Sequence, residues 1–524
     1  MLLVWLLYRY VTSSRVTAAE AEAKDRASNQ KEEIVLRAGR RRPDLPDYSF
    51  DEISEHTSKE NRIWVTFHDG VYDITDFIGG HPGGERILMA VGGALEPFWD
   101  LYGVHKSVHV LEILEEMRIG NILSDEDKKQ LHHETVDYFL NEPKRHPVLK
   151  MHTEKPFNAE TPRGILVESF LTPNEFFFVR NHLPVPDVRH AGHAHRVEIG
   201  GVGIKKPVVL NVDDLKRNFK IYKVTTTMQC SGNRRSDMHK LKPVKGLPWS
   251  VGAISTAEWT GVKLSDVLAY VGADESKVNH VIFQGLDRDM DGSCFEASIP
   301  AATAFDPRRD VLLAFEMNGK ELPVDHGYPL RVVVPGTIGA RQVKWLHRIT
   351  ISETESQSFW QQKDYKTFNP SAVWEGMNLI TAKAIQEYPV QAAICLPEPG
   401  TTITGDYLVV KGYAISGGGN GIVRVDVTLD GGESWYEAKL SPLNQAPHRE
   451  WAWTLWETSI LLPKGHKGEV EIAIKATDTS HNTQPETDSG IWNARGLLET
   501  KWHRVKVYID TPKQDAKPSP KVPR

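Results

Sequence analysis

Two histidines, His81 and His105, stand 24 residues apart in segments whose composition suits the binding of a flat metal cofactor. His81 lies in the segment from Phe77 to Gly84, where a proline fixes φ and glycines let the backbone approach a cofactor closely. His105 ends the segment from Leu101 to His105 and would offer a second imidazole from another loop. Because two axial imidazoles leave an iron without a vacant site, the pair predicts electron transfer rather than chemistry on a substrate.

A second candidate site surrounds Cys230, which lies in the segment from Thr227 to Arg235, before a Gly-Asn turn and a pair of arginines. Neighbouring cations favour the thiolate, which is the form of cysteine that binds metals. A cysteine taken singly is more often an inert buried residue, so the metal-binding hypothesis depends on the surrounding residues. The chain has only three cysteines, so we expect no disulfide framework.

The composition describes a multidomain globular protein. A length of 524 residues gives room for three or four packed units. The net charge of -6 argues against general nucleic-acid binding, which needs a basic surface. The apolar stretch from Met1 to Leu7 is too short to span a membrane, so we expect no membrane span. The residues that follow contain Arg9 and Arg15 but no acid before Glu20, as in an organelle import segment.

The hydrophobic patterns change along the chain and predict successive domains. In residues 370–511, strands of alternating polarity joined by Gly-rich turns indicate a β-sandwich. We predict a leader and linker over residues 1–46, a compact α+β domain over 47–122, a flexible tether over 123–145, a mixed α/β domain over 146–369, an immunoglobulin-like β-sandwich over 370–511 and a disordered tail over 512–524.

The first domain resembles cytochrome b5 from about Tyr48 to Asn121, including the run from Val71 to Phe77. The resemblance implies a b-type haem with His81 and His105 as axial ligands of the iron. From Asp44 to Arg118 the sequence holds 15 acidic and 5 basic residues, a charge that would steer a cationic partner such as a basic cytochrome. A solvated acidic face without a partner remains an alternative.

The region from about His146 to Asp510 resembles the sulfite oxidase family of molybdopterin enzymes. The resemblance rests on three segments, Phe176 to His182, Thr227 to Arg235 and Asp325 to Gly336. It implies a molybdenum ion bound by a pterin dithiolene and by the sulfur of Cys230. The residues implied to bind the pterin cofactor are Phe178, Val179, Arg180, Asn181, His182, Asp287, His326, Arg331, Gln342, Val343 and Lys344.

Small oxyanions such as sulfite are bound well by converging guanidinium groups, which donate two hydrogen bonds at once. Arg180, Arg235 and Arg495 fit this role, and the family resemblance adds Trp249 and Tyr365. The resemblance implies oxidation of sulfite to sulfate, with electrons passed through the haem to cytochrome c. It further implies a homodimer formed through the β-sandwich and a location in the mitochondrial intermembrane space.

Two other functions remain open at this point. A nitrate-reductase-like enzyme would share the molybdenum domain and the haem module, but Arg495 favours sulfite because nitrate reducers usually lack arginine there. A non-catalytic haem electron carrier would need neither Cys230 nor the arginines. Analysis for molybdenum and pterin would separate the carrier from the enzymes.

Overall fold

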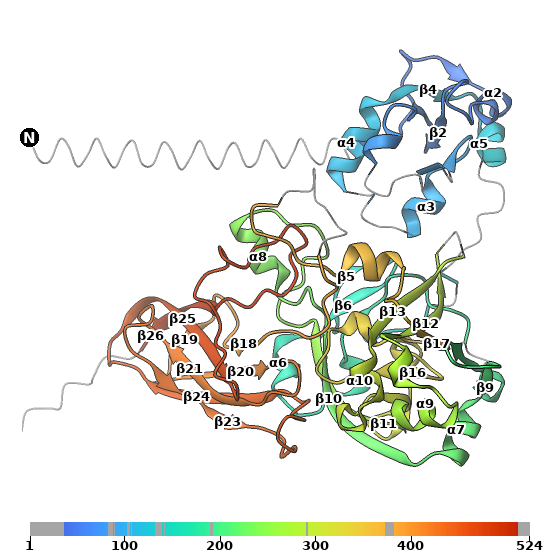
Figure 1. Cartoon of the computed structure of the whole chain (residues 1–524). Coiled ribbons are helices and arrows are strands. Elements are labelled where there is room, and N and C mark those ends of the chain that lie inside the picture. The colour runs from blue at the N-terminus through green and yellow to red at the C-terminus, as the bar shows by residue number, and fades with distance from the viewer. Residues whose placement is uncertain are drawn as a thin grey trace, which may run out of the picture. The chain divides into compact units, whose positions relative to one another are not determined.

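The computed structural model describes residues 36–81, 87–88, 90–101, 105, 107–131, 139–140, 142–188, 192–289, 292–372 and 382–511. The chain divides into two compact units at residue 140 (Figure 1). Residues 1–35 of the expected leader and linker over 1–46, and the expected tail over 512–524, lie outside the described residues. Among the helices that the structure describes, none has the length and apolar character needed to cross a membrane.

The first unit is built on a four-stranded sheet with the strand order β1-β4-β3-β2. Strands β1 and β4 pair in parallel, and the other neighbours pair antiparallel. This arrangement confirms the predicted α+β domain. Its elements are β1 (Asp47–Tyr48), α2 (Phe50–Glu55), β2 (Trp64–Phe67), β3 (Gly70–Asp73), η1 (Ile78–Gly80), α3 (Glu96–Leu101), α4 (Val108–Glu116), β4 (Arg118–Ile122) and α5 (Asp125–Leu131).

Local sequence signals explain where these elements begin and how they pack. The side chain of Ser49 caps α2 by accepting the Glu52 N–H at 3.3 Å, and the Glu52 carboxylate accepts the Ser49 N–H at 2.9 Å. Buried apolar side chains of β2, β3 and α4 form the core. Because α3, α4 and η1 pack on this core, the chain segments that carry the two histidines are held by one hydrophobic cluster.

The bounds 47–122 and the tether over 123–145 stay predictions, and the structure shows specific contacts on both sides of the first domain. Before Asp47, Arg41 donates to the Ile122 carbonyl at 2.9 Å and the Arg42 N–H donates to the Asn121 side chain at 2.8 Å. The expected tether over 123–145 contains α5, whose Asp127 accepts the Phe50 N–H at 2.8 Å. Three acids in the first turn of α5 favour this helix through its dipole, which the interpretation as a tether overlooked.

The second unit begins with three sheets that form the mixed α/β part. Their strand orders are β5-β6-β7, β10-β11-β14-β15 with β16 beside β14, and β13-β12-β17-β8-β9. The strands are β5 (Lys150–Thr153), β6 (Asn158–Glu160), β7 (Val179–Arg180), β8 (Val197–Gly201), β9 (Val208–Leu210), β10 (Ile221–Gln229), β11 (Ile254–Lys263), β12 (His280–Arg288), β13 (Cys294–Pro300), β14 (Leu312–Met317), β15 (Lys320–Glu321), β16 (Arg331–Val333) and β17 (Leu346–Ser352).

Short helices connect these strands and carry many of the predicted site residues at their ends. They are α6 (Arg163–Leu166), η4 (Asn174–Phe176), η5 (Gly192–Ala194), α7 (Val212–Asn218), α8 (Arg235–Leu241), α9 (Leu264–Tyr270), η6 (Glu275–Lys277), α10 (Ala301–Phe305), η7 (Pro307–Arg309), η8 (Val324–His326), η9 (Gly339–Arg341) and η10 (Trp360–Asp364). The antiparallel ladder of β10 and β11 runs to the pair Gln229–Ile254, so Cys230 follows directly after a fully paired strand.

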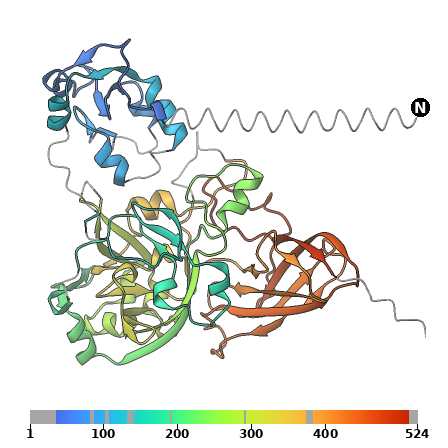
Figure 2. The same cartoon turned by 180° about the vertical axis from the view of Figure 1, so that it is seen from behind.

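Two antiparallel-rich sheets form the predicted β-sandwich, with orders β18-β20-β24-β23 and β19-β26-β25-β21-β22. Alternate residues of both sheets bury one shared apolar core. In Figure 2 the orange and red strands of the sandwich gather apart from the green and yellow sheets. The strands are β18 (Gln391–Leu396), β19 (Thr402–Ile403), β20 (Tyr407–Ile415), β21 (Ile422–Thr428), β22 (Tyr436–Glu437), β23 (Lys439–Ser441), β24 (Thr454–Leu461), β25 (Lys467–Asp478) and β26 (His503–Asp510).

Candidate haem and molybdenum sites

The two predicted haem ligands lie close together in the first unit. His81 follows η1 directly, and the centroids of the His81 and His105 rings lie 6.2 Å apart with planes 13° from parallel. Rings in van der Waals contact lie closer, whereas a metal about 2 Å from a nitrogen of each imidazole accounts for such a separation. Phe77 and Trp99 pack beside the two rings, at 5.9 and 5.7 Å between centroids. The residues therefore fit a haem with two axial histidines.

Cys230 lies in a loop whose backbone is fixed on every side. Its N–H donates to the Ala253 carbonyl at 3.0 Å, and its carbonyl accepts the Asn233 N–H at 2.9 Å. The Asn233 amide in turn donates to the Tyr413 hydroxyl at 2.8 Å, in the β-sandwich. A Cβ on Gly232 would lie 2.5 Å from the Arg235 guanidinium, so the turn needs glycine. The buried thiol is thus held in one place, as a metal ligand should be.

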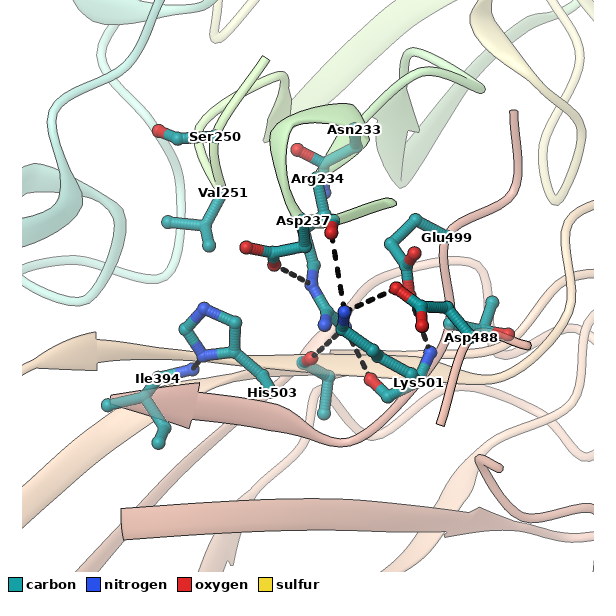
Figure 3. Close-up of polar contacts among 12 residues, drawn as sticks. Asn233, Arg234, Asp237, Ser250, Val251, Ile394, Asp488, Glu499, Lys501 and His503 are labelled. Atoms are coloured by element: carbon teal, nitrogen blue, oxygen red, sulfur yellow. Dashed lines mark hydrogen bonds and ion pairs between the residues drawn. The ribbon is translucent and has the colours of Figure 1, made fainter. Parts of the chain in front are cut away.

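Arg234, for which the sequence indicated no role, links this loop to the β-sandwich. It begins α8 in the left-handed conformation with φ 64°, and its fully buried guanidinium pairs with Asp237 at 3.2 Å. It also donates to the carbonyls of Ala392 at 3.2 Å and Lys501 at 2.8 Å (Figure 3). His503 lies in the same cluster, and burial and the charge of Arg234 keep its pKa well below the ordinary value.

Arg235 and Tyr365 lie near Cys230, and Arg180 and Arg495 lie near Arg235. Arg235 donates to the carbonyls of Leu247 at 2.8 Å and Arg495 at 3.0 Å, which brings the sandwich loop against α8. Burial lowers the pKa of Arg495 to about 10, and the charges of Arg235 and Arg180 contribute to this shift. Burial also lowers the pKa of Arg235, which the Cys230 sulfur and Tyr365 oppose. Such mutual repulsion shows that the cluster is cationic and suited to a small anion.

An acidic side chain contacts one of these arginines, Arg495. Asp364, at the end of η10 and directly before Tyr365, forms an ion pair with Arg495. One carboxylate beside three guanidinium groups leaves the four side chains with a net positive charge. The cluster therefore remains suited to an anion of the size of sulfite.

Tyr365 and Trp249 are the other two residues predicted to contact sulfite, and both are buried. Burial raises the pKa of Tyr365 despite the nearby arginines, so its hydroxyl stays protonated and hydrogen-bonds the His182 ring. Burial and the charges of Arg180 and Lys344 hold the pKa of His182 well below its ordinary value, so the imidazole is neutral. Trp249 is fully buried, and its indole N–H has no acceptor among the described residues. An oxyanion or a cofactor atom would supply one.

The predicted pterin-binding residues form a second, continuous polar cluster. The ammonium of Lys344 donates to the Arg180 carbonyl at 3.2 Å, to the Asp325 carbonyl at 2.9 Å and to the Asn181 side chain. Burial lowers the pKa of Lys344 and raises that of Asp287, which lies close enough to interact with it electrostatically. Phe178, Val179 and Val343 contribute buried apolar surface.

Arg331 organises the other side of this cluster. Its guanidinium donates to the carbonyls of His326 and Gln342, each at 2.9 Å, and burial lowers its pKa to about 9. The Gln342 side chain accepts the Val334 N–H at 3.3 Å, so it too supports the loop. Burial lowers the pKa of His326 to about 3, so its imidazole is neutral. Buried cations that are costly to hold without an anion fit the phosphate of a pterin cofactor.

Asp325 and Arg145 are residues that sequence reasoning missed. The Asp325 carboxylate accepts the Asn181 side-chain amide at 3.1 Å and the Arg145 guanidinium at 2.7 and 2.8 Å. Asp325 stands directly before His326 in a segment already singled out, which was the available signal. Arg145 had no signal of that kind, since its partner lies 180 residues away.

Comparisons with known proteins match a haem-binding domain, a molybdopterin-binding domain and a dimerisation domain in this chain. Three family models match: "Cytochrome b5-like Heme/Steroid binding domain" over residues 49–123, "Oxidoreductase molybdopterin binding domain" over 182–360 and "Mo-co oxidoreductase dimerisation domain" over 382–510. A protein of Gallus gallus named "Sulfite oxidase" is 50% identical, over 88% of this chain and 100% of its own. A protein of Homo sapiens named "Sulfite oxidase, mitochondrial" is 49% identical, over 88% of this chain and 84% of its own. The solved structure of the sulfane dehydrogenase SoxCD from Paracoccus pantotrophus is similar with a TM-score of 0.57 at 27% identity, over 70% of this chain and 87% of that one.

Proposed function

This chain belongs to the sulfite oxidase family, and from that premise we propose that it oxidises sulfite to sulfate and passes the electrons through a b-type haem to cytochrome c. The observation that carries the proposal is the cationic cluster in which Arg235, next to Cys230, lies close to the half-buried Arg180 and Arg495. A non-catalytic haem carrier would have no use for this cluster.

The residues that would hold each cofactor follow from the two sites. His81 and His105 would bind the haem iron, and the Cys230 sulfur would bind molybdenum. Asn181, Lys344 and the neighbouring polar groups would hold the pterin. Molybdenum bound there would supply a two-electron oxidation, and the haem would accept the electrons one at a time.

The protein's own groups have distinct tasks in this reaction. The three guanidinium groups would bind the oxygens of sulfite and leave its sulfur lone pair exposed. The indole N–H of Trp249 would add a further hydrogen bond. The neutral His182 and the protonated Tyr365 hold each other in place at the edge of the pocket. Fixed donors of this kind bind the anion without reorganising.

The acidic first unit supports cytochrome c as the acceptor, because a cationic partner would be steered toward it. We propose a homodimer on the basis of the match over residues 382–510. The name of the Homo sapiens relative supports a mitochondrial location, which we place in the intermembrane space.

The decisive experiment mixes the metal-replete protein with sulfite in the absence of oxygen and follows the haem absorption. We expect prompt reduction of the haem in the wild type and none in Cys230→Ser. If the haem stays oxidised although molybdenum is present, sulfite is not the substrate. Oxidation of chemically reduced haem by nitrate would then be the next measurement.

A further inference from the structure

Arg145 makes an unusually complete set of contacts for a residue near the start of the second unit. Its Nε and Nη2 atoms reach the two carboxylate oxygens of Asp325 at 2.7 and 2.8 Å. Nη2 also pairs with Glu142, and the guanidinium carbon lies 4.2 Å from the centre of the Phe157 ring. The side chains of Arg145 and Asp325 are only 11% and 9% exposed, so this pair is largely shielded from solvent.

The same carboxylate reaches the residues that would hold the pterin. The Oδ1 atom of Asp325 accepts the Asn181 amide at 3.1 Å, and the Asp325 carbonyl accepts the Lys344 ammonium at 2.9 Å. Lys344 bonds to the Asn181 side chain as well, so three residues close a ring of hydrogen bonds. Arg145 is therefore linked through Asp325 to Asn181 and Lys344, two residues of the proposed cofactor site.

The charges explain why Arg145 cannot be lost without effect. Burial opposes ionisation of Asp325, but the hydrogen bonds and charge of Arg145 keep its pKa below the ordinary value. Without Arg145, the buried carboxylate would keep one full cation, Lys344, as its main partner. Removing one partner of a buried pair leaves a costly charge, and the remaining groups rearrange to reduce that cost. Such a rearrangement would draw Lys344 and Asn181 toward Asp325.

We propose that Arg145 is a positioning residue for the molybdenum-pterin cofactor, which it acts on by clamping Asp325 and thereby orienting Asn181 and Lys344. The inference rests on the proposed cofactor-binding roles of those two residues. It also gives a function to Glu142 and Arg145, which lie at the end of the range 123–145 that we predicted to be a flexible tether.

The test compares Arg145→Gln with wild type as full-length protein loaded with both cofactors. After dilution, molybdenum and pterin are measured over time relative to haem, which the same chain carries in a separate unit. We expect Arg145→Gln to lose the pterin about tenfold faster or more, as for other groups that orient a ligand. Arg308→Gln is the matched control, because exposed Arg308 makes the same two-pronged contact with Asp306 at 3.0 Å for each bond. Equal pterin loss in the two variants would overturn the proposal.

Three further variants separate the possible causes. Arg145→Lys keeps the charge but not the two-pronged geometry, and we expect partial rescue of pterin retention. If Arg145→Gln fails to fold, the double variant Arg145→Gln/Asp325→Asn removes the unpaired charge. We expect the double variant to fold and still to release pterin faster than wild type. Pterin retention equal to that of wild type would refute the role of Arg145. Lys344→Met tests the site itself. If Lys344→Met keeps its pterin, the proposed cofactor site is wrong, whereas loss there with retention in Arg145→Gln refutes only the role of Arg145.

Discussion

Replacing Arg495 with glutamine is expected to weaken sulfite binding by one to two orders of magnitude. Burial and two neighbouring arginines lower the pKa of Arg495 to about 10, and Asp364 forms an ion pair with it. A bound anion would give this guanidinium a second negative partner beside Asp364. A hydrogen bond to a charged group contributes about 1.5–3 kcal/mol, and about 1.4 kcal/mol corresponds to a tenfold change in affinity. The weaker binding should therefore raise the sulfite concentration needed for half-saturation.

The assay is anaerobic stopped-flow reduction of the haem at increasing sulfite, with molybdenum content matched between proteins. Arg504→Gln serves as control, because Arg504 is another arginine of the β-sandwich, paired with Glu471 at 2.7 Å. Arg495→Lys should lie between wild type and Arg495→Gln, since lysine keeps the charge without the planar fork. An unchanged half-saturation concentration in Arg495→Gln would refute the reasoning, even if the limiting rate fell.

Three further predictions concern the loop, the fold and the haem. Gly496→Ala should lower the free energy of unfolding in urea by about 1–3 kcal/mol, because Gly496 has φ 59° and a Cβ would lie 2.6 Å from Arg235 Cγ. For Asp237, burial raises the pKa but Arg234 and other partners hold it below the ordinary value. The ionised Asp237 carboxylate stabilises the fold at pH values above its unfolded-state pKa, and this stabilisation is lost as the pH falls. The difference in free energy of unfolding between wild type and Asp237→Asn should therefore narrow from neutral to acidic pH. His105→Met should raise the haem reduction potential in a redox titration.

Each of these predictions has a result that would contradict it. Gly272 has φ 74°, but a Cβ added there would meet no atom within 4 Å, so Gly272→Ala measures backbone strain alone. If Gly496→Ala and Gly272→Ala destabilise the fold equally, a clash with Arg235 does not contribute to the effect of Gly496→Ala. A stability gap for Asp237→Asn that stays constant with pH would mean that its carboxylate gains nothing from Arg234. An unchanged potential in His105→Met would exclude His105 as an axial ligand.

The signals for the proposed metal ligands are local in the sequence. Gly79 and Gly80 of η1 precede His81, and a Gly-Asn turn follows Cys230, as the structure shows, whereas residues 82–84 lie outside the described part of the chain. The β-sandwich is equally accessible, since alternation with period two continues through whole strands. Such features depend on neighbours a few residues apart.

The contacts that fasten the sites are long-range, which is why the sequence did not reveal them. Arg234 bonds to the carbonyl of Lys501, 267 residues away, and Arg145 to Asp325, 180 residues away. A charged side chain is normally exposed, so both arginines carried no signal of burial. For the same reason, a run of charges suggested a tether where α5 and Arg145 in fact make specific contacts.

The two ends of the proposed electron path have opposite charge, and salt should therefore affect them differently. Sulfite would meet largely shielded arginines, whereas cytochrome c would meet an acidic unit with 15 acidic and 5 basic residues between Asp44 and Arg118. Exposed charges are screened over about 10 Å at 0.1 M salt, and buried ones much less. Raising the ionic strength should therefore slow cytochrome c reduction steeply while changing haem reduction by sulfite far less. Equal salt dependence of the two half-reactions would mean that acceptor binding does not depend on the acidic face.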